Sequence, residues 1–150
     1  IGSRCSIGSF DHPTTWFSVM EFQYRNCQST YNESLNGIIP YNDSLTKKTL
    51  IGSDVWIGDN VFVKSGTKIG HGSIIGAGSI VVKDIEPFSI NVGAPSRRIR
   101  YRFDRSIINR YLQSKWWDKL NISDLEGIAF NDPLLAISQV EELLEDLRSK

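Results

Sequence analysis

Two histidines are the side chains of this sequence best suited to proton transfer. The chain of 150 residues contains His12 and His71 and no other histidine. A neutral imidazole accepts a proton near neutral pH, because its ordinary pKa is about 6.5, so it can act as a general base toward a hydroxyl group. His12 lies in DHPTTW, where a regular repeat breaks off, whereas His71 lies inside the repeat, in IGHGSI. We expect His71 to be an exposed turn residue. For His12 two interpretations stay open, a general base and an ordinary loop histidine.

The repeat that would position these side chains runs from Leu50 to Ile85. Two registers with a spacing of six residues make it up: Ile51, Ile57, Val63, Ile69, Ile75 and Val81, and then Val55, Val61, Thr67, Ser73, Ser79 and Ile85. A helix would rotate every sixth residue around its surface, and a plain strand alternates with period two. A period of six instead predicts short strands joined by turns, with three hexads in each triangular turn of a parallel β-helix. Residues 51–68 and 69–86 would form two complete coils, with the aliphatic anchors inside.

Two further hexads open the chain, and a long excursion separates them from the main repeat. IGSRCS and IGSFDH are anchored by Ile1 and Ile7, so we expect the sequence to start inside the column. Residues 13–48 have no anchor series and many polar and aromatic residues. Connections of this length are usually functional or disordered, and the aromatic residues argue against disorder. We therefore predict a loop that projects from the column and packs on a neighbouring subunit.

The regular pattern ends after the second coil. Residues 87–103 form an exit segment that we expect to leave the column, because Pro87 and Pro95 interrupt strand pairing. We therefore assign residues 1–103 to one mainly β domain that contains the column, the excursion and the exit segment.

A helical pattern follows the exit segment. Asp104 is a candidate N-cap for a first helix, and Asp132 with Pro133 is a typical start of a second. The apolar side of the second helix would consist of Leu134, Ile137, Val140, Leu144 and Leu147. We predict that residues 104–150 form a C-terminal helical extension that packs on the column or on a neighbour.

The end of the repeat carries a family resemblance. Residues 75–103 read IGAGSIVVKDIEPFSINVGAPSRRIRYRF. Together with the hexads, this segment resembles the left-handed β-helix acyltransferases, and within them the xenobiotic and sugar O-acetyltransferase branch, which includes chloramphenicol, streptogramin and polysaccharide O-acetyltransferases. The resemblance implies a left-handed parallel β-helix and the use of acetyl-CoA as co-substrate.

The resemblance also implies a role for His12. In the family the catalytic histidine lies at the base of such a loop, where it takes the proton of the acceptor hydroxyl as the oxygen attacks the thioester. The family segment often carries a Ser-Thr-x-Pro-Phe element, whereas this chain has SVMEF, and the departure concerns the acceptor side. Asp11 and Glu21 are the acids near His12 in sequence, and each is either an orienting partner or a solvated side chain.

A second set of residues would bind acetyl-CoA by the same resemblance. Main-chain groups near three small or unobtrusive positions would face the pantetheine arm, a lysine would lie near the phosphates, and a proline would support the adenine. Arg97 and Arg100 match the basic exit positions, and Arg98 is an additional candidate for the 3′-phosphate. For each arginine a solvated surface charge is the alternative. An arginine suits phosphate because its planar guanidinium presents a fixed fork of donors. For the tryptophan, a place near the pantetheine end and packing at a subunit interface stay open. The set consists of Trp56, Asp59, Gly76, Ala77, Lys83, Pro95, Arg97, Arg98 and Arg100.

A three-sided column with bulky outward residues favours closed assembly. The outward positions are Trp56, Phe62, Ile74 and Ile80. Exposed apolar faces of this kind are costly, and cyclic symmetry is the common way to cover them, so we predict a homotrimer.

Composition excludes several other classes. The 17 basic and 17 acidic residues balance, so no nucleic-acid partner is expected, and no apolar run approaches the roughly 20 residues that span a bilayer. Cys5 and Cys27 form a poor disulfide framework, so we expect reduced thiols and a cytoplasmic protein. A zinc enzyme on this fold would need three histidines, and the sequence has two.

The predicted function is therefore an acetyl-CoA-dependent O-acetyltransferase that needs no metal. The acceptor would be a small molecule or a glycan, and the HPTTW loop favours a sugar or polysaccharide unit. Two alternatives stay open, an antibiotic O-acetyltransferase and a non-catalytic scaffold on the same fold.

Overall fold

The computed structural model describes most of the chain. The described residues are 1–9, 12, 14–17, 19 and 47–149. Asp11, Glu21, Cys27 and most of the predicted excursion 13–48 lie outside the described residues, and the predictions made for them stay predictions.

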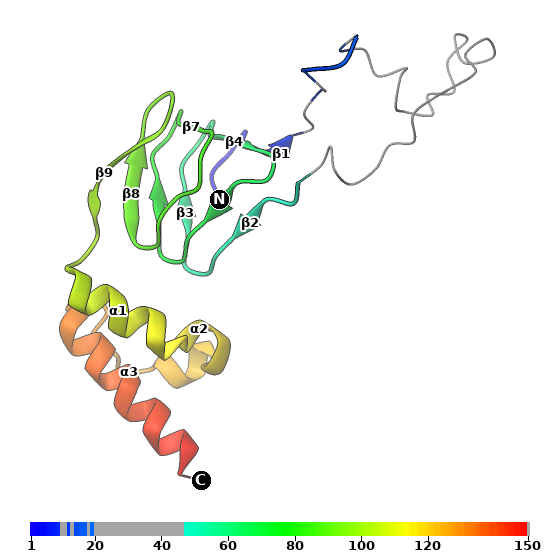
Figure 1. Ribbon diagram of the computed structural model, residues 1–150. Helices are drawn as coiled ribbons and strands as arrows, with labels where there is room; N and C mark the ends of the chain where they lie inside the picture. Colours follow the sequence, from blue (N-terminus) through cyan, green and yellow to red (C-terminus); the bar gives the residue numbers. More distant parts are fainter. Residues whose placement is uncertain (10–11, 13, 18, 20–46, 150) are drawn as a thin grey trace, which may run out of the picture.

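Short parallel strands form three sheets that the chain visits in rotation. The strands are β1 (Ser6–Ser9), β2 (Leu50–Ile51), β3 (Trp56–Ile57), β4 (Phe62–Lys64), β5 (Lys68–Ile69), β6 (Ile74–Ile75), β7 (Ile80–Val81), β8 (Ser89–Val92) and β9 (Arg97–Tyr101). Their order is β1-β4-β7 in one sheet, β2-β5 in the second and β3-β6-β8-β9 in the third. Within the third sheet Trp56 pairs with Ile74 and Ile57 with Ile75 in parallel. Each residue thus pairs with the residue three hexads later, as the period of six predicts, and the coils stack side by side (Figure 1).

The aliphatic anchors form the core of this column. Ile57, Val63 and Ile75 are fully buried, and their neighbours in the first register from Ile57 to Val81 are buried as well. Full burial of a side chain of this size stabilises the fold by about 1.5–3 kcal/mol. Ile51 departs from the expectation, because 39% of its surface is exposed. It lies in β2, which pairs with β5 alone among the strands of the described residues.

The second register buries serines without leaving their hydroxyl groups unpaired. The Ser73 hydroxyl donates to the Gly70 carbonyl oxygen at 2.8 Å, and the Ser79 hydroxyl donates to that of Gly76 at 2.6 Å. A buried hydroxyl without a partner would be costly, so each serine stabilises the turn that precedes it. This explains why a small hydroxyl residue can replace an aliphatic one at these positions.

Glycine is required where neighbouring coils approach each other. A Cβ atom at Gly58 would lie 2.7 Å from the Ala77 nitrogen, and one at Gly72 would lie 2.5 Å from the Phe88 ring. Gly72 also has a φ of +65°, a conformation that side chains disfavour. The spacing between coils therefore depends on these two glycines.

The exit segment stays on the column for longer than the sequence predicts. β8 lies between Pro87 and Pro95 and continues the third sheet in parallel, with Ile74 opposite Ile90. β9 then returns antiparallel to β8. The expectation that residues 87–103 leave the column was wrong for this part, because the segment between the two prolines is long enough for a full strand.

Helices follow on one side of the stacked strands (Figure 1). They are α1 (Arg105–Ser114), α2 (Trp116–Lys119), the 3-10 helix η3 (Ile122–Leu125) and α3 (Pro133–Arg148). Asp132 caps α3 as predicted, since its Oδ1 accepts from the backbone nitrogens of Leu134 and Leu135, both at 3.1 Å. Asp104 precedes α1, but its side chain makes no capping hydrogen bond.

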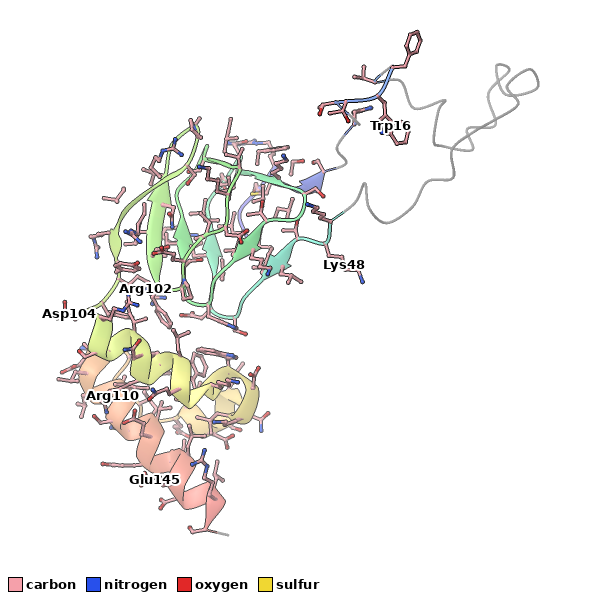
Figure 2. All side chains as sticks on the ribbon, in the orientation of Figure 1. Trp16, Lys48, Arg102, Asp104, Arg110 and Glu145 are labelled. Carbon is pink, nitrogen blue, oxygen red and sulfur yellow. The ribbon has the colours of Figure 1, made fainter. Side chains whose placement is uncertain are left out.

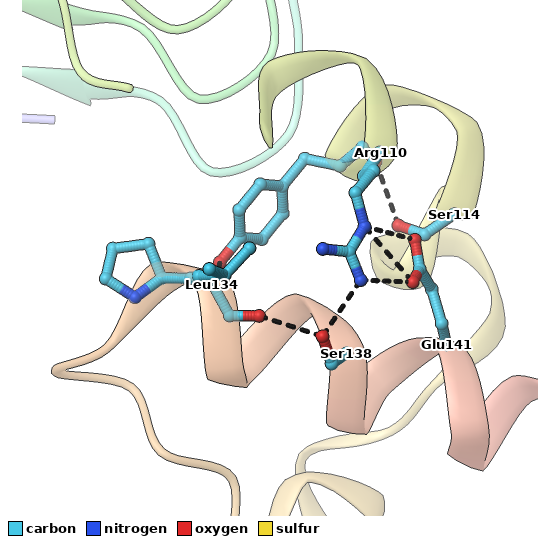
Figure 3. A network of polar contacts seen from close by, with 7 residues as sticks. Arg110, Ser114, Leu134, Ser138 and Glu141 are labelled. Carbon is cyan, nitrogen blue, oxygen red and sulfur yellow. Dashed lines mark hydrogen bonds and ion pairs between the residues drawn. The ribbon is translucent and has the colours of Figure 1, made fainter. Parts of the chain in front are cut away.

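The helices have a small core of their own. Ile137, Val140 and Leu144 are buried there, whereas Leu134 and Leu147, predicted for the same side, are 54% and 47% exposed. An ion pair joins α1 to α3: Arg110 Nε donates to Glu141 Oε1 at 3.1 Å (Figure 3). Arg110 Nη2 also donates to the Ser138 hydroxyl at 2.9 Å, which donates in turn to the Leu134 carbonyl oxygen.

Aromatic rings and one arginine join the helices to the column, as the predicted packing of the extension requires. Tyr111 of α1 lies 5.5 Å from Phe88 and 5.6 Å from Phe103, between ring centroids. Arg102 lies at this junction (Figure 2), where it donates to the Gly72 carbonyl oxygen at 2.7 Å and to Asp54 Oδ2 at 3.0 Å. No helix in the described part of the chain is long and apolar enough to cross a bilayer.

Candidate active site

His12 is exposed at the start of the excursion, and its ring is oriented by the backbone. Its Nδ1 lies 2.7 Å from the Val19 carbonyl oxygen. Because a carbonyl oxygen can only accept, the imidazole donates through Nδ1 in this contact. Among the described residues, a main-chain carbonyl seven residues later thus orients the ring, and the sequence does not reveal this contact.

The predicted pantetheine positions lie on adjacent coils. The Gly78 nitrogen donates to the Asp59 carbonyl oxygen at 2.8 Å, and Asp59 Oδ1 accepts from the Ser3 nitrogen at 2.7 Å. The Gly76 nitrogen donates to the Asn91 carbonyl oxygen at 2.9 Å. Ala77 is exposed, and its main-chain groups make no hydrogen bond within the described residues. Both main-chain groups of Ala77 therefore remain available to a ligand amide, as far as the described residues go.

Trp56 lies on the outer face of the third sheet. It is 63% exposed and stands beside Ile74, its partner in the parallel register. This position fits both open interpretations, since an outward ring on a flat sheet is accessible to a ligand and to a neighbouring subunit alike.

Three of the predicted phosphate-binding residues converge on one cavity. Lys83, Arg97 and Arg98 line a volume of about 290 Å³ next to the β8–β9 hairpin. We call it the hairpin cavity. Its remaining lining residues are Val82, Asp84, Ile85, Glu86, Ser89, Asn91 and Ser96.

Arg100 and Pro95 are not among the residues that line the hairpin cavity. Arg100 is exposed on β9, where its Nη1 donates to the Tyr101 carbonyl oxygen at 2.9 Å. Pro95 is exposed in the turn between β8 and β9. Arg97 therefore lines the hairpin cavity and Arg100 does not, although the resemblance gives both arginines the same role.

The cations of the hairpin cavity differ in their partners. Arg98 forms an ion pair with Glu86, lies 4.5 Å above the Tyr101 ring and contacts the Tyr101 hydroxyl. Within the described residues, Lys83 and Arg97 form no ion pair, and Arg97 Nη1 donates to the Ser96 carbonyl oxygen at 3.2 Å. Arg98 is therefore paired within the protein, while Lys83 and Arg97 line the cavity with no carboxylate partner in the described part of the chain.

Glu86 and Tyr101 are the functional candidates that the sequence analysis missed. The hydrogen bond from the Tyr101 hydroxyl and the charge of Arg98 lower the pKa of Glu86, which is therefore ionised at neutral pH. The same hydrogen bond raises the pKa of Tyr101. The closely spaced charges Lys83, Asp84 and Glu86 could have indicated a polar site in the sequence. The ion pair between Glu86 and Arg98 could not be predicted, because the β8–β9 hairpin brings the two side chains together.

His71 is not the exposed turn residue that the sequence predicts. It is partly buried, its Nδ1 accepts from the Ser53 nitrogen at 2.9 Å, and its ring stacks on Trp117 of α2. These contacts give His71 a structural role. Among the described residues no cluster of three or more His, Cys, Asp or Glu side chains could hold a metal ion.

Comparisons with known proteins identify a family and several relatives of similar sequence. Residues 48–83 match the family model described as bacterial transferase hexapeptide (six repeats). A chloramphenicol acetyltransferase of Escherichia coli is 39% identical over 95% of this chain and 68% of its own length. A chloramphenicol acetyltransferase of Agrobacterium fabrum is 37% identical over 78% of this chain and 58% of its own length.

Solved structures give partial matches. A galactoside acetyltransferase in complex with coenzyme A is 42% identical over 45% of this chain and 37% of its own, with a TM-score of 0.39. A maltose O-acetyltransferase from Clostridium difficile 630 is 38% identical over 43% of this chain and 38% of its own, with the same TM-score of 0.39.

The chain belongs to the hexapeptide-repeat acetyltransferase family. Within that family it is similar to the chloramphenicol acetyltransferases named above, and it spans between 58% and 68% of their length. The resemblance drawn from the hexads and the exit segment is thereby confirmed.

Proposed function

We propose that this protein is an acetyl-CoA-dependent O-acetyltransferase. The observation that carries the proposal is the convergence of Lys83, Arg97 and Arg98 on the hairpin cavity. Such a cluster suits the phosphates of CoA, because arginine and lysine donate charge-assisted hydrogen bonds to phosphate oxygens. The pantetheine arm would run along the coils past Ala77, whose backbone is accessible, and no metal ion takes part.

His12 is the proposed general base. Its Nε2 would take the proton of the acceptor hydroxyl while the oxygen attacks the thioester carbonyl carbon. The tetrahedral oxyanion then collapses, the carbon–sulfur bond breaks, and the CoA thiolate leaves with the proton returned by His12 or as the free anion. The contact with the Val19 carbonyl oxygen supports this role, because the imidazole donates through Nδ1 there, and a neutral ring with its proton on Nδ1 has its lone pair on Nε2.

The proposal includes the architecture of the whole assembly. Residues 1–103 would form a left-handed β-helix domain and residues 104–150 a helical extension. Three copies would form a homotrimer, since Trp56 and Ile80 leave 63% and 41% of their surfaces exposed on the outside of the column. The free thiol of Cys5 fits a cytoplasmic protein.

The proposed acceptor is a hydroxyl of a sugar or polysaccharide unit, as the loop after His12 favours. A specific observation supports a second acceptor class. Four relatives that are 34–39% identical to this chain are named chloramphenicol acetyltransferase, and they favour an antibiotic alcohol. The two acceptors require the same base and the same CoA site, so they differ only in which panel compound is acetylated.

The test measures free thiol released from acetyl-CoA with a panel of sugars and antibiotic alcohols. We expect His12→Ala to lower kcat by about 10²- to 10⁴-fold and to leave CoA affinity unchanged. His71→Asn is the matched histidine control, because it keeps an acceptor near the Ser53 nitrogen. Turnover by His12→Ala at the wild-type rate would refute the base assignment. A wild-type protein whose melting temperature does not respond to saturating acetyl-CoA would support the scaffold alternative instead.

A further inference from the structure

Glu86 forms an ion pair with Arg98 in the lining of the hairpin cavity. Glu86 Oε2 accepts from both Arg98 Nη1 and the Tyr101 hydroxyl. Arg98 Nη1 also contacts the Tyr101 hydroxyl at 2.5 Å, and its guanidinium carbon lies 4.5 Å above the Tyr101 ring. Glu86 lies just before β8, and Arg98 and Tyr101 lie in β9. Their mutual contacts therefore form only when the β8–β9 hairpin has folded.

The charges around the cavity give this contact a consequence. Three cations and two carboxylates line it. The Asp84 carboxylate accepts from the Lys68 nitrogen at 2.8 Å, so it is committed to the backbone of the neighbouring coil. Glu86 is therefore the carboxylate that offsets a cation of the cavity, and Arg98 is the cation that it offsets.

We propose that Glu86 is a positioning residue that competes with the ligand phosphate for Arg98. Lys83 and Arg97 would bind phosphate from the outset, whereas Arg98 would engage it only after leaving Glu86. The proposal rests on the proposed function, since it assigns a control element to the same CoA site. Its consequence is a weaker grip on CoA and a faster release of the spent carrier.

The competition is feasible because the ion pair is accessible. The Arg98 and Glu86 side chains are 44% and 58% exposed, and exposed ion pairs contribute little to stability. A phosphate monoester carries a charge of nearly −2 and three acceptor oxygens, so it offers Arg98 more than one carboxylate does. The 3′-phosphate of CoA is such a monoester, whereas the diphosphate bridge carries one charge on each phosphorus. Arg98, which the family resemblance already makes a candidate for the 3′-phosphate, would therefore meet that group when it leaves Glu86.

The test compares CoA with 3′-dephospho-CoA by titration calorimetry and stopped-flow release at low salt. We expect Glu86→Gln to bind CoA roughly two- to fivefold more tightly, through slower release, because an exposed pair is worth no more than that. The same variant should bind 3′-dephospho-CoA like the wild type. Glu86→Gln combined with Arg98→Gln should lose the gain. Glu126→Gln, which removes an exposed carboxylate outside the cavity, is the matched charge control.

Two results would overturn the proposal. One is a Glu86→Gln variant whose affinity for CoA is unchanged or weaker, and the other is an equal gain for both nucleotides, which would indicate a general charge effect. If Glu86→Gln fails to fold, Glu86→Asp replaces it, since its shorter side chain draws the carboxylate away from Arg98 and should give a smaller gain for CoA alone. Absence of any CoA binding by the wild type would refute the proposed function as well, so the two failures are distinguishable.

Discussion

The rings of His71 and Trp117 stack with their centroids 4.5 Å apart and their planes inclined by 15°. His71 belongs to a turn of the column, and Trp117 belongs to α2. Since the His71 Nδ1 also accepts from the Ser53 nitrogen, the ring is fixed on one side by the column and on the other by the helix. The contact therefore couples the stability of the helical extension to that of the column.

Loss of the Trp117 ring should weaken this coupling. We expect Trp117→Ala to lower the free energy of unfolding by about 1–3 kcal/mol, because it removes a stacked and partly buried ring. Trp117→Phe keeps a ring and should lose less. Urea unfolding followed by circular dichroism provides the measurement, and a cycle with His71→Ala should give a coupling energy of about 0.5–1.5 kcal/mol. Strict additivity of the two substitutions would contradict the coupling.

Arg97 and Arg100 should differ in their effect on CoA binding. Arg97 lines the hairpin cavity, whereas Arg100 donates to the Tyr101 carbonyl oxygen outside it. We expect Arg97→Ala to weaken CoA binding by about tenfold at low salt and by less at high salt, since salt screens the lost attraction. Arg100→Ala is the matched control and should change the dissociation constant by less than about twofold. Titration calorimetry at two ionic strengths decides the matter, and equal effects would point to another phosphate site.

The period of six was sufficient to predict how the column is built. Ile57 pairs with Ile75 in the register that three hexads require, because each anchor must stack on the one a full turn away. β8 was not predicted because Pro87 and Pro95 suggest an interruption from local sequence alone. The four residues of β8 form a strand because they pair with β6, which lies at the edge of the preceding coil. Ile51 was placed in the core because its type fits the repeat, although the strands that would cover it are a property of the whole stack.

The candidate site shows a different limit of sequence reasoning. The resemblance gave Lys83 and Arg97 separate places near the CoA phosphates, and the structure places both in the lining of one cavity. The role of Glu86 was not predictable, because its partner Arg98 is brought close by the pairing of β8 with β9. His71 likewise has a local sequence typical of an exposed turn, and its burial depends on Trp117 from a distant helix.

Tyr111 should make the protein sensitive to alkali. Burial raises the pKa of Tyr111 above its usual range. The folded state then keeps the phenol proton at a pH where the unfolded chain has lost it, so stability is fully present below about pH 10 and falls as the pH rises through the folded pKa. Tyr111→Phe should lose less stability than the wild type between pH 10 and higher values.

A cost of this substitution appears at neutral pH. The Tyr111 hydroxyl donates to the Pro133 carbonyl oxygen at 3.1 Å, and its removal should lower stability by about 1 kcal/mol. Denaturant unfolding of both proteins across the pH range measures the two effects together. Parallel curves for the wild type and Tyr111→Phe above pH 10 would exclude Tyr111 as the titrating group.

Truncation of one anchor should test whether the column is a packed core. Ile75 is fully buried between the coils, whereas Ile51, which has the same side chain and the same place in the repeat, is 39% exposed. We expect Ile75→Ala to cost about 2–5 kcal/mol, since it removes buried methyl groups and leaves a cavity between layers that cannot close around it. Ile51→Ala removes the same atoms from a half-open position and should cost less than about half as much. Chemical unfolding measures the free energy of unfolding of both variants, which lose the same side-chain atoms. Equal losses of stability would mean that burial within the stack does not determine how much an anchor contributes.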